Sequence, residues 1–151
     1  MIHKFELRKN WPRSEFLMFS CVLITANSIF STTKHTYVVT EKCLYQMKKD
    51  ETITLVKKVS DLEGLTTSAD PKQSAFIIHF QGPLHGKDDL LIDSKTDENP
   101  DKNELFENLQ AAFYLSHQQY LPKFEIPLEK KLKDYLRGKE KSLKLSDHFV
   151  E

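Results

Sequence analysis

The hydrophobic pattern of this chain changes its period once, near residue 94. Before that point, short β-branched and aromatic runs alternate with polar turns, whereas after it apolar residues recur every three to four positions. Short strand signals at such spacing are typical of an antiparallel sandwich or barrel. A single amphipathic helix that follows can cover the part of the core that the strands leave open. The pattern therefore predicts a mainly β domain with one C-terminal helix.

Strand signals fill the first part of the chain. They cover residues 20–30, 35–40, 43–47, 52–59, 61–68, 74–80 and 90–93. Within the sixth segment, alternation places Phe76 and Phe80 on one face and Ile77 and His79 on the other. We therefore expect an antiparallel barrel of about seven strands.

A helix is predicted over residues 100–120. Asn99 is its candidate cap, and Pro100 suits the first helical position. The apolar stripe consists of Leu105, Phe106, Leu109, Ala112, Phe113 and Tyr120. Beyond Pro122, "KFEIPL" predicts another short strand, and the Lys-rich stretch after it is left open between strand, helix and tail. We divide the chain into an N-terminal arm (1–18), a barrel with its capping helix (19–122) and a C-terminal strand with a basic tail (123–151).

Charge is balanced overall but unevenly placed. The 151 residues suffice for one domain, and 22 Lys and Arg face 22 Asp and Glu. A net charge of zero provides no global attraction to nucleic acid or to an anionic membrane, so electrostatic binding must be local. Residues 88–107 are acidic and residues 123–144 are basic, and for both runs a solvated surface is the ordinary interpretation.

Targeting and redox features predict a cytoplasmic protein without a transmembrane segment. The longest apolar run, residues 16–24, is about half the length that spans a bilayer, and no cleavage pattern follows it. Cys21 and Cys43 form no close pair, as is usual for buried thiols in a reducing compartment.

Enzymatic signatures are missing from the sequence. The run "GPLHGK" (82–87) has the wrong glycine spacing for a phosphate loop, and no nucleophile motif holds a serine beside a base. His79, His85, Asp88 and Asp89 have no metal-ligand spacing. The strands also lack the aromatics interleaved with arginines that RNA bases would stack on. We expect a protein that is not an enzyme and that uses no cofactor, metal or nucleic acid.

The order of these features resembles the tail homology domain of class I myosins, a variant of the pleckstrin homology (PH) fold. The resemblance covers about residues 20–120 and rests mainly on apolar and turn positions. Its matching positions are Ala26 and Asn27; Val38, Val39 and Thr40; Leu44 and Tyr45; Lys57 and Lys58; Leu62, Gly64 and Leu65; Phe76 to His79; and Asp89, Leu90 and Leu91. It implies a PH-like barrel that is either an isolated tail domain or a free-standing relative.

The resemblance also implies a membrane-targeting module that binds phosphoinositide or other anionic lipid headgroups through basic residues of the first two strands and their loop. In this chain, Lys34 and His35 are the basic residues of that segment. The expected binding set adds lysines from the following hairpin and strand and consists of Lys34, His35, Lys42, Lys48, Lys49 and Lys57. The expected location is peripheral, at membranes or at the actin-rich cortex.

A protein-interaction adaptor on the same scaffold, with headgroup binding lost, is the alternative function. The zero net charge, the few basic residues of the first loop and the polar helix surface around Ser116 to Gln119 favour it. A partner chain would dock along a strand edge, beside the helix, on the arm that carries Trp11, or on the basic C-terminal stretch.

Overall fold

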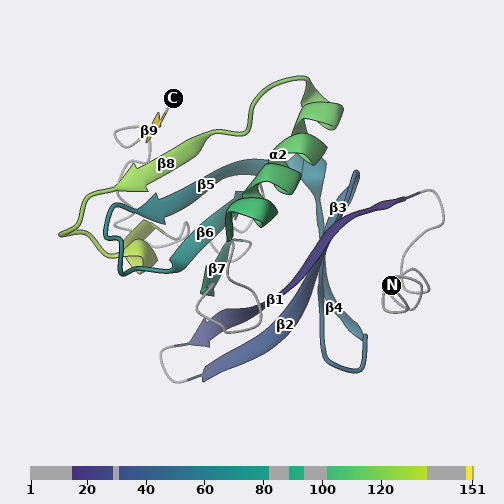
Figure 1. Ribbon diagram of the computed structural model, residues 1–151, viewed down its shortest axis with the longest axis horizontal. Coiled ribbons are helices and arrows are strands. Elements are labelled where there is room, and N and C mark those ends of the chain that lie inside the picture. Colours follow the sequence, from purple (N-terminus) through teal and green to yellow (C-terminus); the bar gives the residue numbers. More distant parts are fainter. Residues whose placement is uncertain (1–14, 29–30, 82–88, 94–101, 136–148, 151) are drawn as a thin grey trace.

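The computed structural model describes residues 15–28, 31–81, 89–93, 102–135 and 149–150. Figure 1 shows strands arranged around one long helix. The strands are β1 (Leu17–Ser28), β2 (Ser31–Thr40), β3 (Cys43–Met47), β4 (Ile53–Lys58), β5 (Leu62–Ser68), β6 (Ala75–Phe80), β7 (Leu90–Asp93), β8 (Lys123–Ile126) and β9 (Phe149–Val150). The helices are α2 (Lys102–His117) and the short 3₁₀-helices η2 (Val59–Asp61) and η3 (Leu132–Tyr135).

One sheet contains all the described strands, in the order β4-β3-β2-β1-β7-β6-β5-β8-β9. Strand β1 joins its two halves, because it pairs with β2 along its length and with β7 through Ile24 and Thr25. The mainly β class and the single long helix are confirmed for the described residues. The prediction of an antiparallel barrel of about seven strands is wrong in two respects. The sheet stays open, with β8 and β9 extending it beyond β5, and the pairing of β5 with β8 is parallel.

Helix α2 covers the core between the two halves of the sheet (Figure 1). Five residues of the predicted stripe are buried there: Leu105, Phe106, Leu109, Ala112 and Phe113. The Phe106 ring meets the Phe76 ring edge to face, with centroids 4.8 Å apart. The sixth predicted residue, Tyr120, is 77% exposed. That prediction is wrong because the helix ends at His117, where Gln118 takes a left-handed backbone conformation and donates its N–H to the Tyr114 carbonyl.

Both faces of the β5–β7 half are covered by apolar side chains. Phe76 and Phe80 lie in the main core, whereas Ile77 lies in a second cluster on the opposite face, as the alternation predicts. In this second cluster, Ile126, Leu132 and Tyr135 pack with Ile77. The residues from β8 to η3 are therefore packed against the sheet and do not form a loose tail.

A buried polar network fixes the start of β7 against β6. The His79 Nδ1 atom lies 2.8 Å from Asp89 Oδ2, and Nε2 lies 2.6 Å from the Thr66 hydroxyl. The other Asp89 oxygen accepts the Phe80 N–H at 3.1 Å. The His79 and Asp89 side chains are 2% and 0% exposed, so the network is a structural link. His85 and Asp88, the two other residues of this His and Asp group in the sequence, lie outside the described residues.

We expect Asp89→Ala to lower the free energy of unfolding by about 2–6 kcal/mol, because it removes the carboxylate partner of the buried His79 ring and of the Phe80 N–H, and each buried group left unsatisfied costs about 1–3 kcal/mol. Urea unfolding measures this loss. The matched control is Glu125→Ala, which removes an exposed carboxylate and should change stability by less than about 0.5 kcal/mol. A loss below about 1 kcal/mol for Asp89→Ala would contradict the structural role of the network.

A second prediction concerns the packing of β8 against β5 at Gly64. A Cβ atom at Gly64 would lie 2.7 Å from the Phe124 ring and 3.2 Å from the Pro122 carbonyl oxygen. We expect Gly64→Ala to cost about 1–3 kcal/mol of stability through overpacking. The cost should fall by at least about 0.5 kcal/mol when Phe124→Ala makes room. If the stability losses of the two substitutions simply add, the close packing of Phe124 on Gly64 is contradicted. The control combines Gly64→Ala with the distant Leu115→Ala, whose stability losses should add.

Candidate functional site

Three of the predicted binding residues gather at one end of the β1–β4 half, which we name the lysine end: Lys34, Lys48 and Lys49. The pairing of β2 with β3 stops at Thr36 and Met47. On β2, Lys34 lies two residues before Thr36. Lys48 and Lys49 are the two residues that follow Met47, where β3 ends. All three lysines are exposed.

The β3–β4 turn that carries two of these lysines is held by its own hydrogen bonds. The Lys48 N–H donates to the Thr52 carbonyl at 3.0 Å, and the Glu51 N–H donates to the Lys48 carbonyl at 2.9 Å. The Asp50 carboxylate accepts the Thr52 N–H at 3.0 Å. This bonding to Thr52 is the main cause that lowers the pKa of Asp50, and the nearby Lys48 adds to it. The acidic residue beside the lysines thus helps to shape their turn.

An irregularity in β4 lies directly after this turn. Gln46 pairs with Leu55 and Met47 pairs with Ile53, so Thr54 is an extra residue. The Thr54 hydroxyl bonds to both the backbone and the side-chain oxygen of Gln46. Such bulges break the regular hydrogen-bonding edge that another strand would need for pairing. The bulge therefore disfavours strand addition at β4.

The other three predicted binding residues do not join the lysine end. His35 is 7% exposed, and its ring lies edge-on to Tyr37. Lys57 faces the core side of β4, where its Nζ lies 5.4 Å from the centre of the Phe80 ring. Lys42 lies at the opposite end of β3, six residues from Lys48 and thus about 20 Å away at about 3.3 Å per residue. The predicted set is therefore divided between two ends and the interior.

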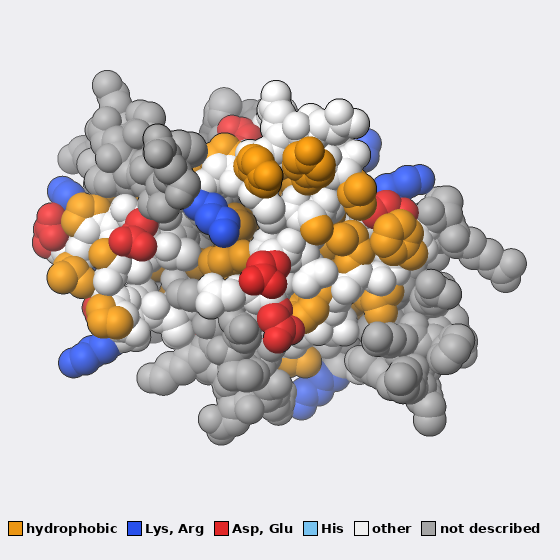
Figure 2. Space-filling model, turned by 45° about the horizontal axis from the view of Figure 1, so that its top comes forward, with side chains coloured by type: hydrophobic (Ala, Val, Ile, Leu, Met, Phe, Trp, Pro, Cys, Tyr) orange, Lys and Arg blue, Asp and Glu red, His pale blue; other side chains and the backbone are white. Residues whose placement is uncertain are grey.

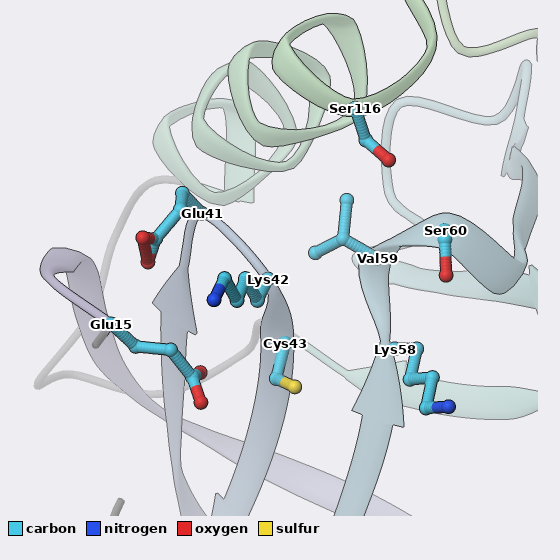
Figure 3. A pocket seen from close by; sticks show the side chains of 8 residues that line it. All are labelled: Glu15, Glu41, Lys42, Cys43, Lys58, Val59, Ser60 and Ser116. Atoms are coloured by element: carbon cyan, nitrogen blue, oxygen red, sulfur yellow. The ribbon is translucent and has the colours of Figure 1, made fainter. Parts of the chain in front are cut away.

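A hollow of about 300 Å³, which we name the junction pocket, lies at the Lys42 end. It is lined by Glu15, Glu41, Lys42, Cys43, Lys58, Val59, Ser60 and Ser116 (Figure 3). The two lysines and two glutamates balance in charge. In Figure 3 the Glu15 carboxylate points toward Cys43, whereas the Lys58 side chain points away from both carboxylates. This arrangement gives an anion no net attraction.

Glu15 connects the start of β1 to the β2–β3 turn. Its Oε1 atom accepts hydrogen bonds from the Thr40 and Tyr45 hydroxyls, both at 2.7 Å. Burial and this bond to Glu15 raise the pKa of Tyr45, and burial together with the Glu15 charge raises the pKa of Cys43. A thiol with a raised pKa is a poor nucleophile near neutral pH. In the junction pocket, Glu15 therefore holds neighbouring strands together through Thr40 and Tyr45.

Sequence reasoning missed Glu15, because a single carboxylate just before an apolar run has no periodic or motif signal. The N-terminal arm was expected to reach residue 18, yet β1 begins at Leu17 and Glu15 is buried. Trp11, the other feature noted in the arm, lies outside the described residues.

The end of α2 exposes apolar side chains. Tyr114, Leu115 and Tyr120 are 46%, 61% and 77% exposed, and the two tyrosine rings lie 5.6 Å apart. Figure 2 shows groups of hydrophobic side chains on the face that includes the helix, with a small number of charged groups among them. We name the surface formed by Tyr114, Leu115 and Tyr120 the tyrosine end, and it is the second candidate for binding.

No protein-family model and no curated protein sequence matches the chain. Solved structures do match. The hSac2 domain from the human phosphoinositide phosphatase Sac2 aligns with a TM-score of 0.60 and 14% identity, over 86% of this chain and 88% of that one. The DH/PH domain of human ARHGEF11, solved in a ternary complex with human RhoA and its inhibitor, aligns with a TM-score of 0.56 and 21% identity, over 68% of this chain.

The linker-DH/PH domains of p115-RhoGEF also align, with a TM-score of 0.53 and 10% identity over 72% of this chain. The chain has a PH-like fold. It covers only 30% and 32% of the ARHGEF11 and p115-RhoGEF chains, so the likeness concerns one part of those proteins. The relationship to class I myosins is not shown by these similarities.

Within the part of the chain that the structure describes, no group of three His, Cys, Asp or Glu side chains is arranged to hold a metal ion. Among the same residues, no helix is both long and apolar enough to cross a bilayer.

Proposed function

We propose that this protein is a non-enzymatic module that binds anionic lipid headgroups, phosphoinositides among them, at the lysine end. The observation that carries the proposal is the convergence of exposed Lys34, Lys48 and Lys49 beside a turn held by its own hydrogen bonds. The PH-like fold supports it, and so does the likeness to a domain of a phosphoinositide phosphatase.

Electrostatics sets the strength that such a site can reach. Each lysine near an anionic surface contributes about 1 kcal/mol, so three give about 3 kcal/mol, or roughly a hundredfold in affinity. Headgroups with several phosphates gain more from the same lysines than singly charged ones, because each ammonium group then meets a denser negative charge. We therefore propose reversible, salt-sensitive attachment at membranes or at the actin-rich cortex.

The preordered β3–β4 turn increases the binding affinity that these few lysines can give. The turn is fixed by bonds from Lys48, Glu51 and Thr52, so binding does not have to order this backbone. His35 and Lys57, which the sequence placed in the site, are held by the core side of the sheet and are not assigned to headgroup contact. The class I myosin relationship stays part of this proposal, supported by the sequence resemblance alone.

Vesicle co-sedimentation tests the proposal. Vesicles with phosphatidylinositol bisphosphate should bind the protein more tightly than vesicles of phosphatidylcholine, and higher salt should weaken the binding. The combined variant Lys34→Ala, Lys48→Ala and Lys49→Ala should lose affinity about a hundredfold. Circular dichroism should show an unchanged fold, because all three side chains are exposed.

The matched control removes equal charge elsewhere, through Lys42→Ala, Lys58→Ala and Lys123→Ala. These lysines are also exposed, but they lie away from the lysine end. The control should bind almost as well as the unaltered protein. Equal losses in the two triple variants would contradict a localised site, and absence of binding at low salt would contradict lipid binding altogether.

A protein-interaction adaptor is the second candidate, favoured by the tyrosine end. Tyrosines that are both exposed and adjacent are common anchors in protein interfaces. The DH/PH domains of ARHGEF11 and PDZRHOGEF that resemble this chain were solved in complex with RhoA, a protein partner of those domains. Under this alternative, Tyr114→Ser with Tyr120→Ser would abolish partner capture while leaving vesicle binding unchanged.

A further inference from the structure

A second basic surface lies on the other half of the sheet, where η3 packs on β6 and β7. It is a hollow of about 390 Å³, which we name the C-terminal hollow. Its floor is apolar and includes Ala75, Leu91 and Leu132. Its rim carries Lys130, Lys131 and Lys133, and among the described residues that line it Asp70 is the one acid.

The lysines of this rim are displayed by a firmly anchored segment. Leu132 and Tyr135 are 6% and 1% exposed and point into the cluster that contains Ile77. In a 3₁₀-helix, residues three apart lie on one side, so Lys131 and Lys133 are left on the outer sides, and both are exposed. The backbone beneath these charges is therefore fixed by core packing.

Leu128 protrudes beside the same lysines. It is 63% exposed, although its neighbours Ile126 and Leu132 are buried. The Lys130 N–H donates to the Pro127 carbonyl at 3.1 Å, which makes residues 127–130 a tight turn with Leu128 near its tip. At the left of Figure 1 this turn lies beside the β5–β6 turn, which contributes Asp70 and Gln73 to the hollow.

The charge balance of the rim selects the kind of partner. Three lysines face Asp70, whose carboxylate already accepts the Lys72 N–H at 2.9 Å, so the rim attracts anions. The same segment also carries Glu129 and Asp134, and exposed Lys72 in the β5–β6 turn adds a fourth lysine, so four lysines stand against three carboxylates in these two turns and the net charge is positive. A protruding leucine flanked by lysines combines an apolar group for the acyl boundary with cations for the headgroups above it.

We propose that the C-terminal hollow and Leu128 form a second membrane contact, whose partner is an anionic bilayer surface. Leu128 enters the headgroup and acyl boundary, and Lys130, Lys131 and Lys133 meet the surrounding lipid charges. This inference rests on the proposed function only in taking a membrane as the partner, and its residues are separate from the lysine end.

The test uses phosphatidylserine vesicles without phosphoinositide, and co-sedimentation of the full chain. Leu128→Ser should weaken binding about tenfold. The combined Lys130→Ala, Lys131→Ala and Lys133→Ala variant should weaken it about a hundredfold. The matched control, Leu115→Ser, removes a leucine of similar exposure (61%) from the end of α2 and should bind as the unaltered protein does.

The outcomes separate this inference from the proposed function. Weaker binding of the Leu128 and rim variants, with the lysine-end variant still binding phosphatidylinositol bisphosphate fully, would support the second contact and contradict the lysine end. If the lysine-end variant loses affinity for phosphatidylinositol bisphosphate vesicles and the Leu128 and rim variants lose affinity for phosphatidylserine vesicles, both sites are supported. Unchanged binding of Leu128→Ser and of the rim variant overturns the inference, and so does a Leu115→Ser loss that equals that of Leu128→Ser.

Discussion

The apolar stripe of α2 is the contact on which the rest of this domain depends. The sheet does not close on itself, so the core between its two halves would meet water without the helix. Leu105, Leu109 and Ala112 are fully buried there, and the Phe106 ring packs on Phe76. Burial of each large side chain contributes about 1.5–3 kcal/mol, so the helix is a major part of the stability of the fold.

Anchors at the periphery connect this core to the surfaces proposed for binding. The ring of His117, in the last turn of α2, lies 3.0 Å from the Ser60 carbonyl in η2, which follows directly on β4. Glu15 bonds the start of β1 to Thr40 and Tyr45. With β4 and β1 fixed in this way, the β3–β4 turn projects from a rigid support. Both proposed membrane contacts thus include a short turn on packed elements, which is how a domain with zero net charge can concentrate charge locally.

Much of the fold was readable from the sequence, because alternation and helical periodicity are strong where one face of an element is buried. The opposite faces of Phe76 and Ile77 in β6, and the five buried residues of the helical stripe, follow directly from that periodicity. The predicted end of the helix, residue 120, lies three residues too far along the chain. Gln118 takes the left-handed conformation that ends α2, but a glycine usually occupies such a position and none marks it in the sequence. Strand β8 was expected from its composition, but its parallel pairing with β5 depends on contacts distant in sequence, such as Phe124 against Gly64.

The candidate site was less predictable than the fold. Residue type alone grouped Lys42 and Lys57 with the lysine end, because a sequence shows charges but not which end of a hairpin they occupy. Strand alternation sends Lys57 and Lys58 to opposite faces of β4, and the structure accordingly places Lys57 half-buried and Lys58 exposed. The role of Lys130, Lys131 and Lys133 needed the packing of η3, which no local pattern specified.

Headgroup binding at the lysine end is tested most sharply by following the protein's amide chemical shifts during titration with soluble inositol trisphosphate. The headgroup lacks acyl chains, so insertion of Leu128 cannot contribute to the result. If headgroups bind at the lysine end, the amides of Lys34 and of residues 48–52 shift in a saturable manner, while those of Lys42, Lys58 and Val59 stay in place. Shifts centred on the junction pocket, or no saturable shift at all, would contradict binding at the lysine end.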